Sequence, residues 1–396
     1  MRLLFVSGTT VGGSGRSQRE LASRLVQRGH TVSFLVDDGQ TATLTRWSYG
    51  HLSDLAARLG DRAGGSLARR LEAIPGRRVS ISLRGGLDHL ATAVPENAAE
   101  ALLDEFRPDV VIGNSVLRLT WRKIRAMCER RGIPTVLYIR EVESLNHFAG
   151  GTSPATAVVA NAESLASQIA ELGVECTFIP SLIEVGTTLV ESSRKVALAI
   201  NPIESRGVQM VWAIAARLPD VQFAVQESWP LSPREVEAIQ RKCTEVPNVE
   251  FRRVEEPGPR LYRDARVLLV PYRIANRPRV ILEAQANGIP VITAAIPALL
   301  EAVGGGGLQA ELDDLDGWCE ALKRMWSDEE LYESLRLTAQ INSARPDVDP
   351  EAIATSFELL LAQAIRTGTP RDGSRGAGNT GVRSEHAGPP AIEPRA

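Results

Sequence analysis

The chain is poor in the residues on which disulfide frameworks and zinc sites depend. Its 396 residues include four cysteines and five histidines. The cysteines are far apart in sequence and form no C-x-x-C pair, so we interpret them as reduced thiols in a reducing compartment. The histidines show no H-x-x-x-H spacing. A metal site built by the protein is therefore not expected.

Bulk positive charge, aromatic residues and long apolar runs are also scarce. The formal net charge is -3 and 5% of the residues are aromatic, so the chain offers neither the positive field nor the stacking surface of a nucleic-acid-binding protein. No apolar run approaches the length of a membrane span, and residues 3–6 are too short for the core of a signal peptide. We expect a cytoplasmic protein; peripheral membrane contact is compatible with the sequence but is not favoured.

What the chain does contain is a long alternation of short apolar runs and helical segments. Hydrophobic residues make up 43% and charged residues 23%, which suits a globular chain of two domains. Strands followed by helices predict α/β domains with parallel sheets wound on both faces. The strongest boundary signal is a polar joint before the apolar run at residues 195–200. We predict an N-terminal domain over residues 1–190, a second domain over 191–348, a final helix over 349–366 and a disordered tail over 367–396.

One stretch between two apolar runs carries most of the candidate chemistry. Residues 276–290, NRPRVILEAQANGIP, predict a loop and then a helix that ends at an Asn-Gly cap. Arg277 and Arg279 fall at the carboxyl end of the preceding strand, where open α/β sheets bind ligands. Glu283 comes one turn into the helix. There it suits a sugar or ribose hydroxyl pair beside a phosphate group, but it equally suits a charge that only balances the helix dipole.

A glycine-rich loop follows the first apolar run. Gly12, Gly13 and Ser14 precede a helix, so their backbone N–H groups lie near its N-terminus. The loop lacks the G-x-G-x-x-G order of a dinucleotide fingerprint, although Asp37 and Asp38 after the second strand could serve as its ribose-binding acid. A nicotinamide-dependent oxidoreductase is kept as an alternative. The glycines could also do no more than permit a tight turn.

Polar residues follow later strands of the N-terminal half as well. Arg140 and Glu141 come after one apolar run, where they either pair with each other or face a cleft. Asn161 comes after the next and is expected to be the N-cap of a helix. His147 is a separate candidate, although a lone histidine is more often structural. The arginine-rich region over residues 49–95 suits a solvated helix face, or else a platform for an anionic acceptor or a membrane surface.

These motifs resemble a known family. Residues 279–292 look like the nucleotide-binding signature of the retaining, family-4-type glycosyltransferases of the GT-B fold. The resemblance implies two Rossmann-like domains facing across a cleft, with the last helix crossing back to the N-terminal domain. In the family signature two glutamates are separated by seven residues. The second matches Glu283, which the resemblance implies contacts the ribose, and the first, which touches the donor sugar, falls at Ala275.

The loop after the strand at residues 195–200 is similar to the family's diphosphate clamp. Arg206 stands where the family has a lysine, and Asn201 stands where it has an arginine. One cation is therefore kept and one is lost, and Arg277 or Arg279 could offset that loss. Further along, Glu301 is kept before its helix, whereas the family's glycines are replaced, with Ala298 among the replacements. Trp229 either walls a base pocket or packs in the core.

The resemblance implies a retaining glycosyltransferase that uses a nucleotide-sugar donor and a small-molecule or glycan acceptor. Arg206 and Arg279 would stabilise charge on the leaving diphosphate, and Glu141 would act on the acceptor side, as Glu143 also could. No divalent metal is implied, and no cofactor beyond the donor. The residues expected to bind the donor are Gly12, Gly13, Ser14, Asn201, Arg206, Arg277, Arg279, Val280 and Glu283. The alternative is a GT-B scaffold or partner subunit that binds nucleotide or acceptor without transfer, which the departures at Ala275, Asn201 and Ala298 would explain.

Overall fold

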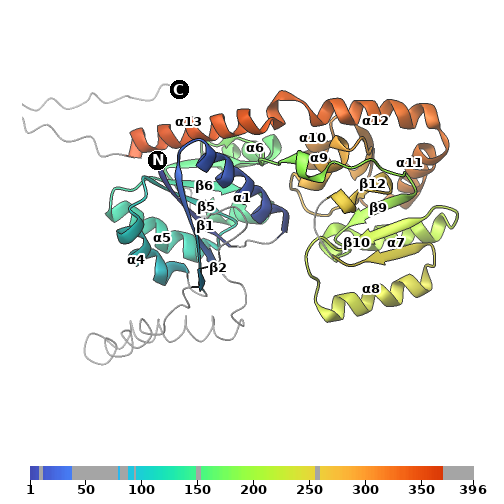
Figure 1. The fold of residues 1–396 in the computed structure, drawn as a ribbon, viewed down its shortest axis with the longest axis horizontal. Helices are drawn as coiled ribbons and strands as arrows, with labels where there is room; N and C mark the ends of the chain where they lie inside the picture. The colour runs from blue at the N-terminus through green and yellow to red at the C-terminus, as the bar shows by residue number, and fades with distance from the viewer. Residues whose placement is uncertain are drawn as a thin grey trace, which may run out of the picture.

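A computed structural model describes residues 1–8, 12–37, 79–80, 88–92, 95–148, 153–254 and 259–368. Most of the predicted basic region over residues 49–95 lies outside these ranges, as do Asp38 and the predicted tail from residue 369 onward. Figure 1 shows two lobes side by side, joined along one edge by a run of helix. None of the described helices is both long enough and apolar enough to span a membrane.

The N-terminal lobe is built on an eight-stranded sheet in the order β3-β4-β2-β1-β5-β6-β7-β8. Every pairing is parallel except that of β3 with β4. Its strands are β1 (Arg2–Ser7), β2 (Thr31–Asp37), β3 (Val79–Ser80), β4 (Asp88–Thr92), β5 (Val110–Asn114), β6 (Thr135–Ile139), β7 (Ala157–Ala160) and β8 (Thr177–Phe178). The order reverses beside β1, and the first βα loop follows that strand, as in Rossmann-like domains.

Helices cover both faces of this sheet because its central strands are apolar on both sides. The first face packs on α1 (Gly12–Gln27) and α13 (Pro350–Gly368), through residues such as Leu21 and Phe357. The second packs on α4 (Pro95–Phe106), α5 (Arg118–Arg130) and α6 (Glu163–Glu171), through residues such as Trp121 and Leu165. Because all strands except β3 run parallel, their carboxyl ends lie at one edge of the sheet.

The C-terminal lobe holds a six-stranded parallel sheet in the order β11-β10-β9-β12-β13-β14. Its strands are β9 (Val196–Ile200), β10 (Phe223–Gln226), β11 (Val249–Arg252), β12 (Ala265–Val270), β13 (Val291–Ala294) and β14 (Gly307–Ala310). Its helices are α7 (Val208–Arg217), α8 (Pro233–Glu245), α9 (Arg279–Ala286), α10 (Pro297–Val303), α11 (Leu315–Ser327) and α12 (Glu329–Ser343). One apolar core spans the lobe, with Phe223, Leu268 and Trp318 fully buried. The predicted fold class of two Rossmann-like α/β domains is confirmed.

Helix α13 leaves the C-terminal lobe and packs on the N-terminal one. The Phe357 ring lies 5.9 Å from that of Tyr138, measured between centroids. At its outer edge, Glu358 accepts a hydrogen bond from Arg28 Nη2 at 2.6 Å and lies 2.6 Å from His30 Nε2. The chain thus crosses between the lobes more than once, which ties their relative position to the packing of this helix.

Three helices have bounds that their buried apolar residues alone do not define. Helix α5 begins at Arg118, three residues before Trp121, its first buried apolar residue. Helix α12 continues to Ser343, although Leu337 and Ile341 in its second half are exposed. Helix α10 begins at Pro297, which takes the first helical position after Ile296.

Candidate active site

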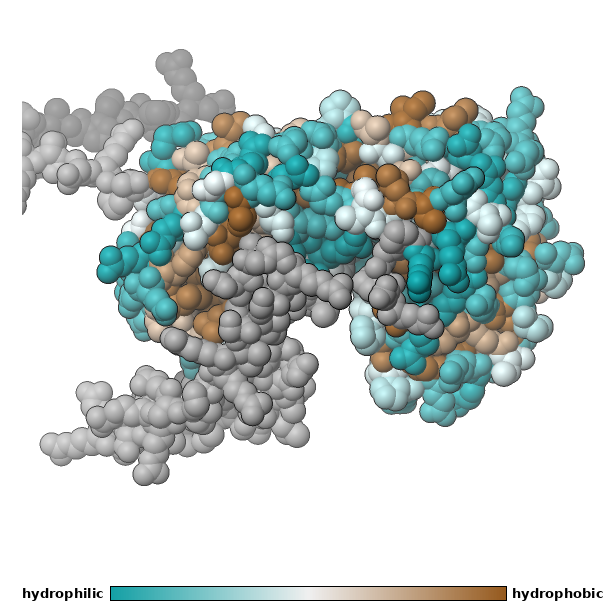
Figure 2. Space-filling model, viewed as in Figure 1, coloured by the Kyte–Doolittle hydropathy of each residue, from teal (hydrophilic) through white to brown (hydrophobic). Residues whose placement is uncertain are grey.

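A cavity of about 620 Å³ lies between the two lobes. Its N-terminal wall consists of Gly12, Gly13, Ser14, Arg16, Ser17, Arg19, Arg140, Glu141, Asn161 and Ser181. Its C-terminal wall consists of Asn201, Arg206, Ser228, Trp229, Pro230, Val254, Leu261, Tyr272, Asn276, Arg277, Pro278, Arg279, Val280 and Glu283. Figure 2 shows that hydrophilic side chains cover much of both lobes on the face it presents. Every residue predicted to bind the donor or to act in catalysis therefore lines this one cavity, on one wall or the other. These residues lie after the carboxyl ends of strands, in loops or in the first turns of helices.

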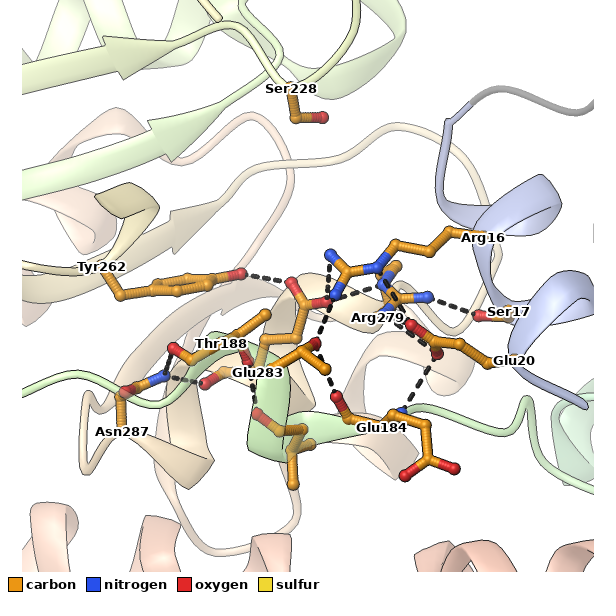
Figure 3. A network of polar contacts seen from close by, with 12 residues as sticks. Arg16, Ser17, Glu20, Glu184, Thr188, Ser228, Tyr262, Arg279, Glu283 and Asn287 are labelled. Carbon is orange, nitrogen blue, oxygen red and sulfur yellow. Dashed lines mark hydrogen bonds and ion pairs between the residues drawn. The ribbon is translucent and has the colours of Figure 1, made fainter. Parts of the chain in front are cut away.

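Arg279 and Glu283 form a buried ion pair on the first turns of α9. Arg279 Nε donates to Glu283 Oε1 at 2.7 Å, and the Tyr262 hydroxyl donates to Glu283 Oε2 at 2.7 Å. Arg279 also donates to Ser17 Oγ at 3.0 Å and to Glu20 Oε1 at 3.0 Å, both on helix α1 of the other lobe. Figure 3 shows Tyr262 and Arg279 approaching Glu283 from opposite sides. Glu283 is thus more than a helix-dipole charge.

The ion pair reduces the positive charge that Arg279 presents to the cavity. Its side chain is 7% exposed and its charge is balanced by two carboxylates. Burial and the negative charge of Glu283 raise the pKa of Tyr262, so that its hydroxyl stays a donor to the carboxylate. Without ligand, the Arg279 guanidinium orients Glu283 and lines the cavity, and its action on the diphosphate stays a prediction.

Arg277 is also engaged. Its Nη2 donates to Asp347 Oδ2 at 3.1 Å, and its guanidinium lies 5.5 Å from the ring centroid of Phe178. Burial lowers the pKa of Arg277, and Asp347 opposes that shift. Arg277 and Arg279 are thus each paired with a carboxylate, and the hypothesis that one of them offsets the cation lost at Asn201 stays a prediction.

Arg206 differs from these two arginines. It ends the 3₁₀ helix η3 (Glu204–Arg206), directly after β9, and its guanidinium lies 4.5 Å from the ring centroid of Tyr272. Gly207 follows with φ +70°, and a Cβ there would come within 1.8 Å of the Pro271 carbonyl oxygen, so only glycine fits this turn. Within the described residues, Arg206 Nε and Nη1 have no hydrogen-bond partner. A cation with unused donors thus lines the cavity.

Asn201 supports the same turn. It adopts φ +58°, and its buried side chain exchanges hydrogen bonds with Ser228 at 2.7 to 3.0 Å. These contacts fix the loop after β10, which carries Trp229. The Trp229 ring faces the cavity and lies where a Cβ on Gly12 would come within 3.6 Å of it. Trp229 therefore lies across the cleft from Gly12, and it is also partly buried against the apolar core of its own lobe.

Gly12, Gly13 and Ser14 form the first turn of α1, not the expected loop before the helix, and this turn is held close to the cleft. Gly12 has φ +72°, and a Cβ on Gly13 would come within 3.3 Å of Arg279 Cδ. Ser14 Oγ accepts a hydrogen bond from Asn114 Nδ2 at 3.3 Å and lies 3.1 Å from Ser115 Oγ. The two first glycines of α1 therefore permit both its turn and the approach of the other lobe.

On the N-terminal wall, Arg140 is the most buried cation. It is 4% exposed, its Nη1 donates to Ser181 Oγ at 3.1 Å, and its guanidinium lies 4.3 Å from the ring centroid of Tyr138. No ion pair joins it to Glu141 among the residues that the structure describes. Its Nε and Nη2 have no partner there either. Burial lowers the pKa of Arg140.

Glu141 and His147 have different surroundings. Burial, together with the charge of Glu143, raises the pKa of the Glu141 carboxyl, while Arg206 and Arg140 oppose the shift. Glu141 lines the cavity, as the acceptor-side prediction requires. His147 Nε2 lies 3.0 Å from the Val116 carbonyl oxygen, outside the cavity wall. Its contact is structural.

Asn161 is not the N-cap of α6, contrary to expectation. Ala162 occupies that position and provides no side-chain cap. The carboxylate of Glu301, on α10 of the other lobe, accepts hydrogen bonds from the backbone N–H groups of Glu163 at 2.7 Å and Ser164 at 2.8 Å. Sequence reasoning missed this cap because its two parts are more than a hundred residues apart. Asn161 is left facing the cavity.

Two family models match the chain, one for each lobe. The description "Glycosyltransferase Family 4" matches residues 11–185, and "Glycosyl transferases group 1" matches residues 228–328. A search of curated proteins finds no match. In the described residues, no three His, Cys, Asp or Glu side chains gather as a metal site would require.

Solved structures share the whole architecture at low sequence identity. Sucrose-phosphate synthase from Thermosynechococcus elongatus is 13% identical over 92% of this chain and 99% of its own, with a TM-score of 0.71. HepE of Anabaena, solved with UDP-glucose, is 14% identical over 92% and 100%, with a TM-score of 0.68. A glycosyltransferase from Rickettsia africae is 11% identical over 92% and 98%, with a TM-score of 0.66.

The fold and the cleft define a GT-B protein. With both lobes matched by glycosyltransferase models, the chain belongs to the family-4-type glycosyltransferases. The oxidoreductase alternative is set aside on these matches.

Proposed function

We propose that the protein transfers a sugar from a nucleoside diphosphate sugar to an acceptor hydroxyl, with retention of anomeric configuration, and that Arg206 binds the diphosphate. The observation that carries this proposal is the state of Arg206: its buried Nε and Nη1 lack partners, and it lines the cavity between the lobes. Unsatisfied buried donors cost about 1–3 kcal/mol each, so an anionic ligand that pairs with them binds strongly.

The chemistry follows from the placement of charge on the two walls. As the bond between the anomeric carbon and the diphosphate oxygen breaks, negative charge grows on the diphosphate, and Arg206 stabilises it. The acceptor hydroxyl attacks the anomeric carbon from the face of the sugar that the diphosphate leaves. The proton of that hydroxyl passes to the departing phosphate oxygen. Glu141, on the opposite wall, accepts a hydrogen bond from the acceptor and orients it. No protein nucleophile is required.

The nucleoside end of the donor is assigned to Glu283. Its carboxylate is fixed by Tyr262 and Arg279, so it is already oriented before a ribose hydroxyl reaches it. HepE of Anabaena, a structural neighbour, was solved with UDP-glucose and with UDP and glucose, which makes UDP the first nucleotide to test. The first turn of α1, with Gly12, Gly13 and Ser14, would lie along the phosphates.

The donor sugar is bound differently from the way the family signature implies. Ala275 has no side chain that can grip a sugar hydroxyl, and Ala298 is 2% exposed in the core. Glu301, which the signature keeps, caps α6 and does not line the cavity. We therefore propose that these departures select a different sugar, since they leave Arg206 and Glu283 in place.

Isothermal titration with UDP, GDP, dTDP and ADP tests the diphosphate site. One of them is expected to bind wild type, with Kd raised 10- to 100-fold by Arg206→Ala, since a charge-assisted hydrogen bond contributes about 1.5–3 kcal/mol. Arg217→Ala is the matched control, because Arg217 is exposed and pairs with Asp316 away from the cavity. Equal weakening by both variants, or no binding of any nucleotide, would contradict the proposal.

A further inference from the structure

Arg140 is a second cavity-lining arginine whose guanidinium has nitrogens without a hydrogen-bond partner in the described residues. It lies on the wall opposite Arg206. It follows strand β6 in the N-terminal lobe, whereas Arg206 follows β9 in the C-terminal lobe. Only one of its nitrogens, Nη1, has a hydrogen-bond partner in the described part of the chain, the hydroxyl of Ser181. Its side chain is 4% exposed and forms no ion pair within the described residues, so its charge is offset only through space by the carboxylates of Glu141 and Glu20.

The two unused nitrogens identify the kind of ligand. Nε and Nη2 form one edge of the planar guanidinium, the edge that binds two oxygens of a carboxylate or phosphate in parallel. Arg279 in the same cavity differs, because its guanidinium donates hydrogen bonds to the carboxylates of Glu283 and Glu20. The Tyr138 ring beneath Arg140 supports its charge but supplies no acceptor in the guanidinium plane.

A neighbouring polar side chain, Asn161, also lacks a hydrogen-bond partner within the described residues at one of its buried atoms. Asn161 is 3% exposed, its Nδ2 reaches Ser181 Oγ at 3.5 Å, and its Oδ1 has no partner among the described residues. Arg140, Asn161 and Ser181 thus form one set that lines the cavity and is joined through the Ser181 hydroxyl. Buried polar groups are nearly always paired in a finished protein, so an incomplete set at a cavity indicates a missing ligand.

We propose that Arg140, with Asn161 and Ser181, forms a second anion subsite, which binds a carboxylate or phosphate group carried by the transferred sugar or by the acceptor. This inference rests on the proposed function, because the two substrates meet between the walls that carry Arg206 and Arg140. The subsite lies on the N-terminal wall of the cavity, whereas Arg206 lies on the C-terminal wall. It makes an anionic substrate, rather than a neutral sugar pair, the preferred substrate of this enzyme.

The first test uses inorganic phosphate as the probe. With the nucleoside diphosphate that binds present at saturation, phosphate is titrated into wild type, Arg140→Gln and the exposed control Arg122→Gln. Wild type and the control are expected to bind phosphate, and Arg140→Gln is expected to bind it at least 10-fold more weakly while its nucleotide Kd changes less than 2-fold. Equal phosphate binding by all three, or none by wild type, would overturn the subsite.

The design separates this inference from the proposed function. If no nucleotide binds, phosphate is titrated instead into Arg206→Ala and into the double variant with Arg140→Gln, so that Arg140 is still tested. The Tm of the ligand-free protein adds a second readout. An unpaired buried charge is destabilising, so Arg140→Met is expected to raise Tm. A lowered Tm would mean that Arg140 is satisfied by the protein alone, and would overturn the proposal.

Two pairs of ligands then identify which substrate carries the anion. The donor pair is the glucose and glucuronic acid conjugates of the nucleotide that binds, and the acceptor pair is glucose and glucose 6-phosphate. Arg140→Gln is expected to weaken binding of the charged member of one pair at least 10-fold and to spare its neutral member. The affected pair names the source. Equal loss for charged and neutral members in both pairs would overturn the proposal.

Discussion

Arg279 of the C-terminal lobe and Glu20 of the N-terminal lobe form a salt bridge of 3.0 Å beside the cavity, with side chains 7% and 14% exposed. The same guanidinium holds Glu283 at 2.7 Å. One arginine therefore both joins the lobes and orients the carboxylate assigned to the ribose. The position of the N-terminal lobe and the readiness of the nucleotide site are coupled through Arg279.

Glu20→Gln tests this coupling. The substitution keeps the shape of the side chain but leaves Arg279 with one carboxylate in place of two. Since removing one partner of a buried ion pair is costly, we expect the free energy of unfolding to fall by about 1–3 kcal/mol, below the fully buried range because Glu20 is partly exposed. Urea denaturation measures the change. The exposed Glu237→Gln is the control, and an effect no larger than that of the control would show that the bridge contributes nothing.

The sequence predicted one half of this arrangement and could not predict the other. Arg279 and Glu283 are four residues apart on one helix, a spacing at which side chains meet. Glu20 is 259 residues from Arg279, and only the packed lobes bring them together. The sequence also could not predict that the guanidinium groups of Arg206 and Arg140 have nitrogens without hydrogen-bond acceptors in the described part of the chain. A motif shows which residue follows a strand but not which acceptors surround its side chain.

Glu301 provides a second test of contact between the lobes. Its carboxylate accepts from the first N–H groups of α6, so Glu301→Ala should remove an N-cap worth about 1 kcal/mol and loosen the lobes at the same time. Small-angle scattering should show a larger radius of gyration, and hydrogen exchange at Ser164 should accelerate. Asp314→Ala is the matched control, because Asp314 caps α11 within its own lobe. If both variants leave the radius of gyration unchanged, Glu301 does not hold the lobes together.

The docking of α13 should depend on pH. The hydrogen bond from Arg28 lowers the pKa of Glu358, and His30 adds to the shift. A lowered pKa means that the contribution to stability is present above about 4.3, the ordinary value for glutamate, and is lost as pH falls through the lower folded pKa. We expect about 1 kcal/mol or less to be lost, because the contact is partly exposed. Glu358→Gln should flatten this part of a urea-denaturation pH profile; an unchanged profile would contradict the assignment.

Transfer should not depend on a divalent metal. In our account Arg206 supplies the positive charge at the diphosphate, so activity in the presence of EDTA should stay within about 2-fold of the untreated enzyme, far less than the loss expected when a catalytic cation is removed. The measurement is the initial rate of nucleoside diphosphate release, with and without chelator. Loss of activity that added Mg²⁺ or Mn²⁺ restores would contradict this prediction.

Release of nucleoside diphosphate from a nucleotide sugar tests the central claim most directly. UDP-, GDP-, dTDP- and ADP-linked sugars are incubated with wild type, Arg206→Ala and the control Arg217→Ala, with water or a trial sugar as acceptor. The account predicts that one nucleotide is released, at a rate that Arg206→Ala lowers at least 10-fold and Arg217→Ala leaves unchanged. Tight binding of a donor without any release, or release that does not depend on Arg206, would contradict it.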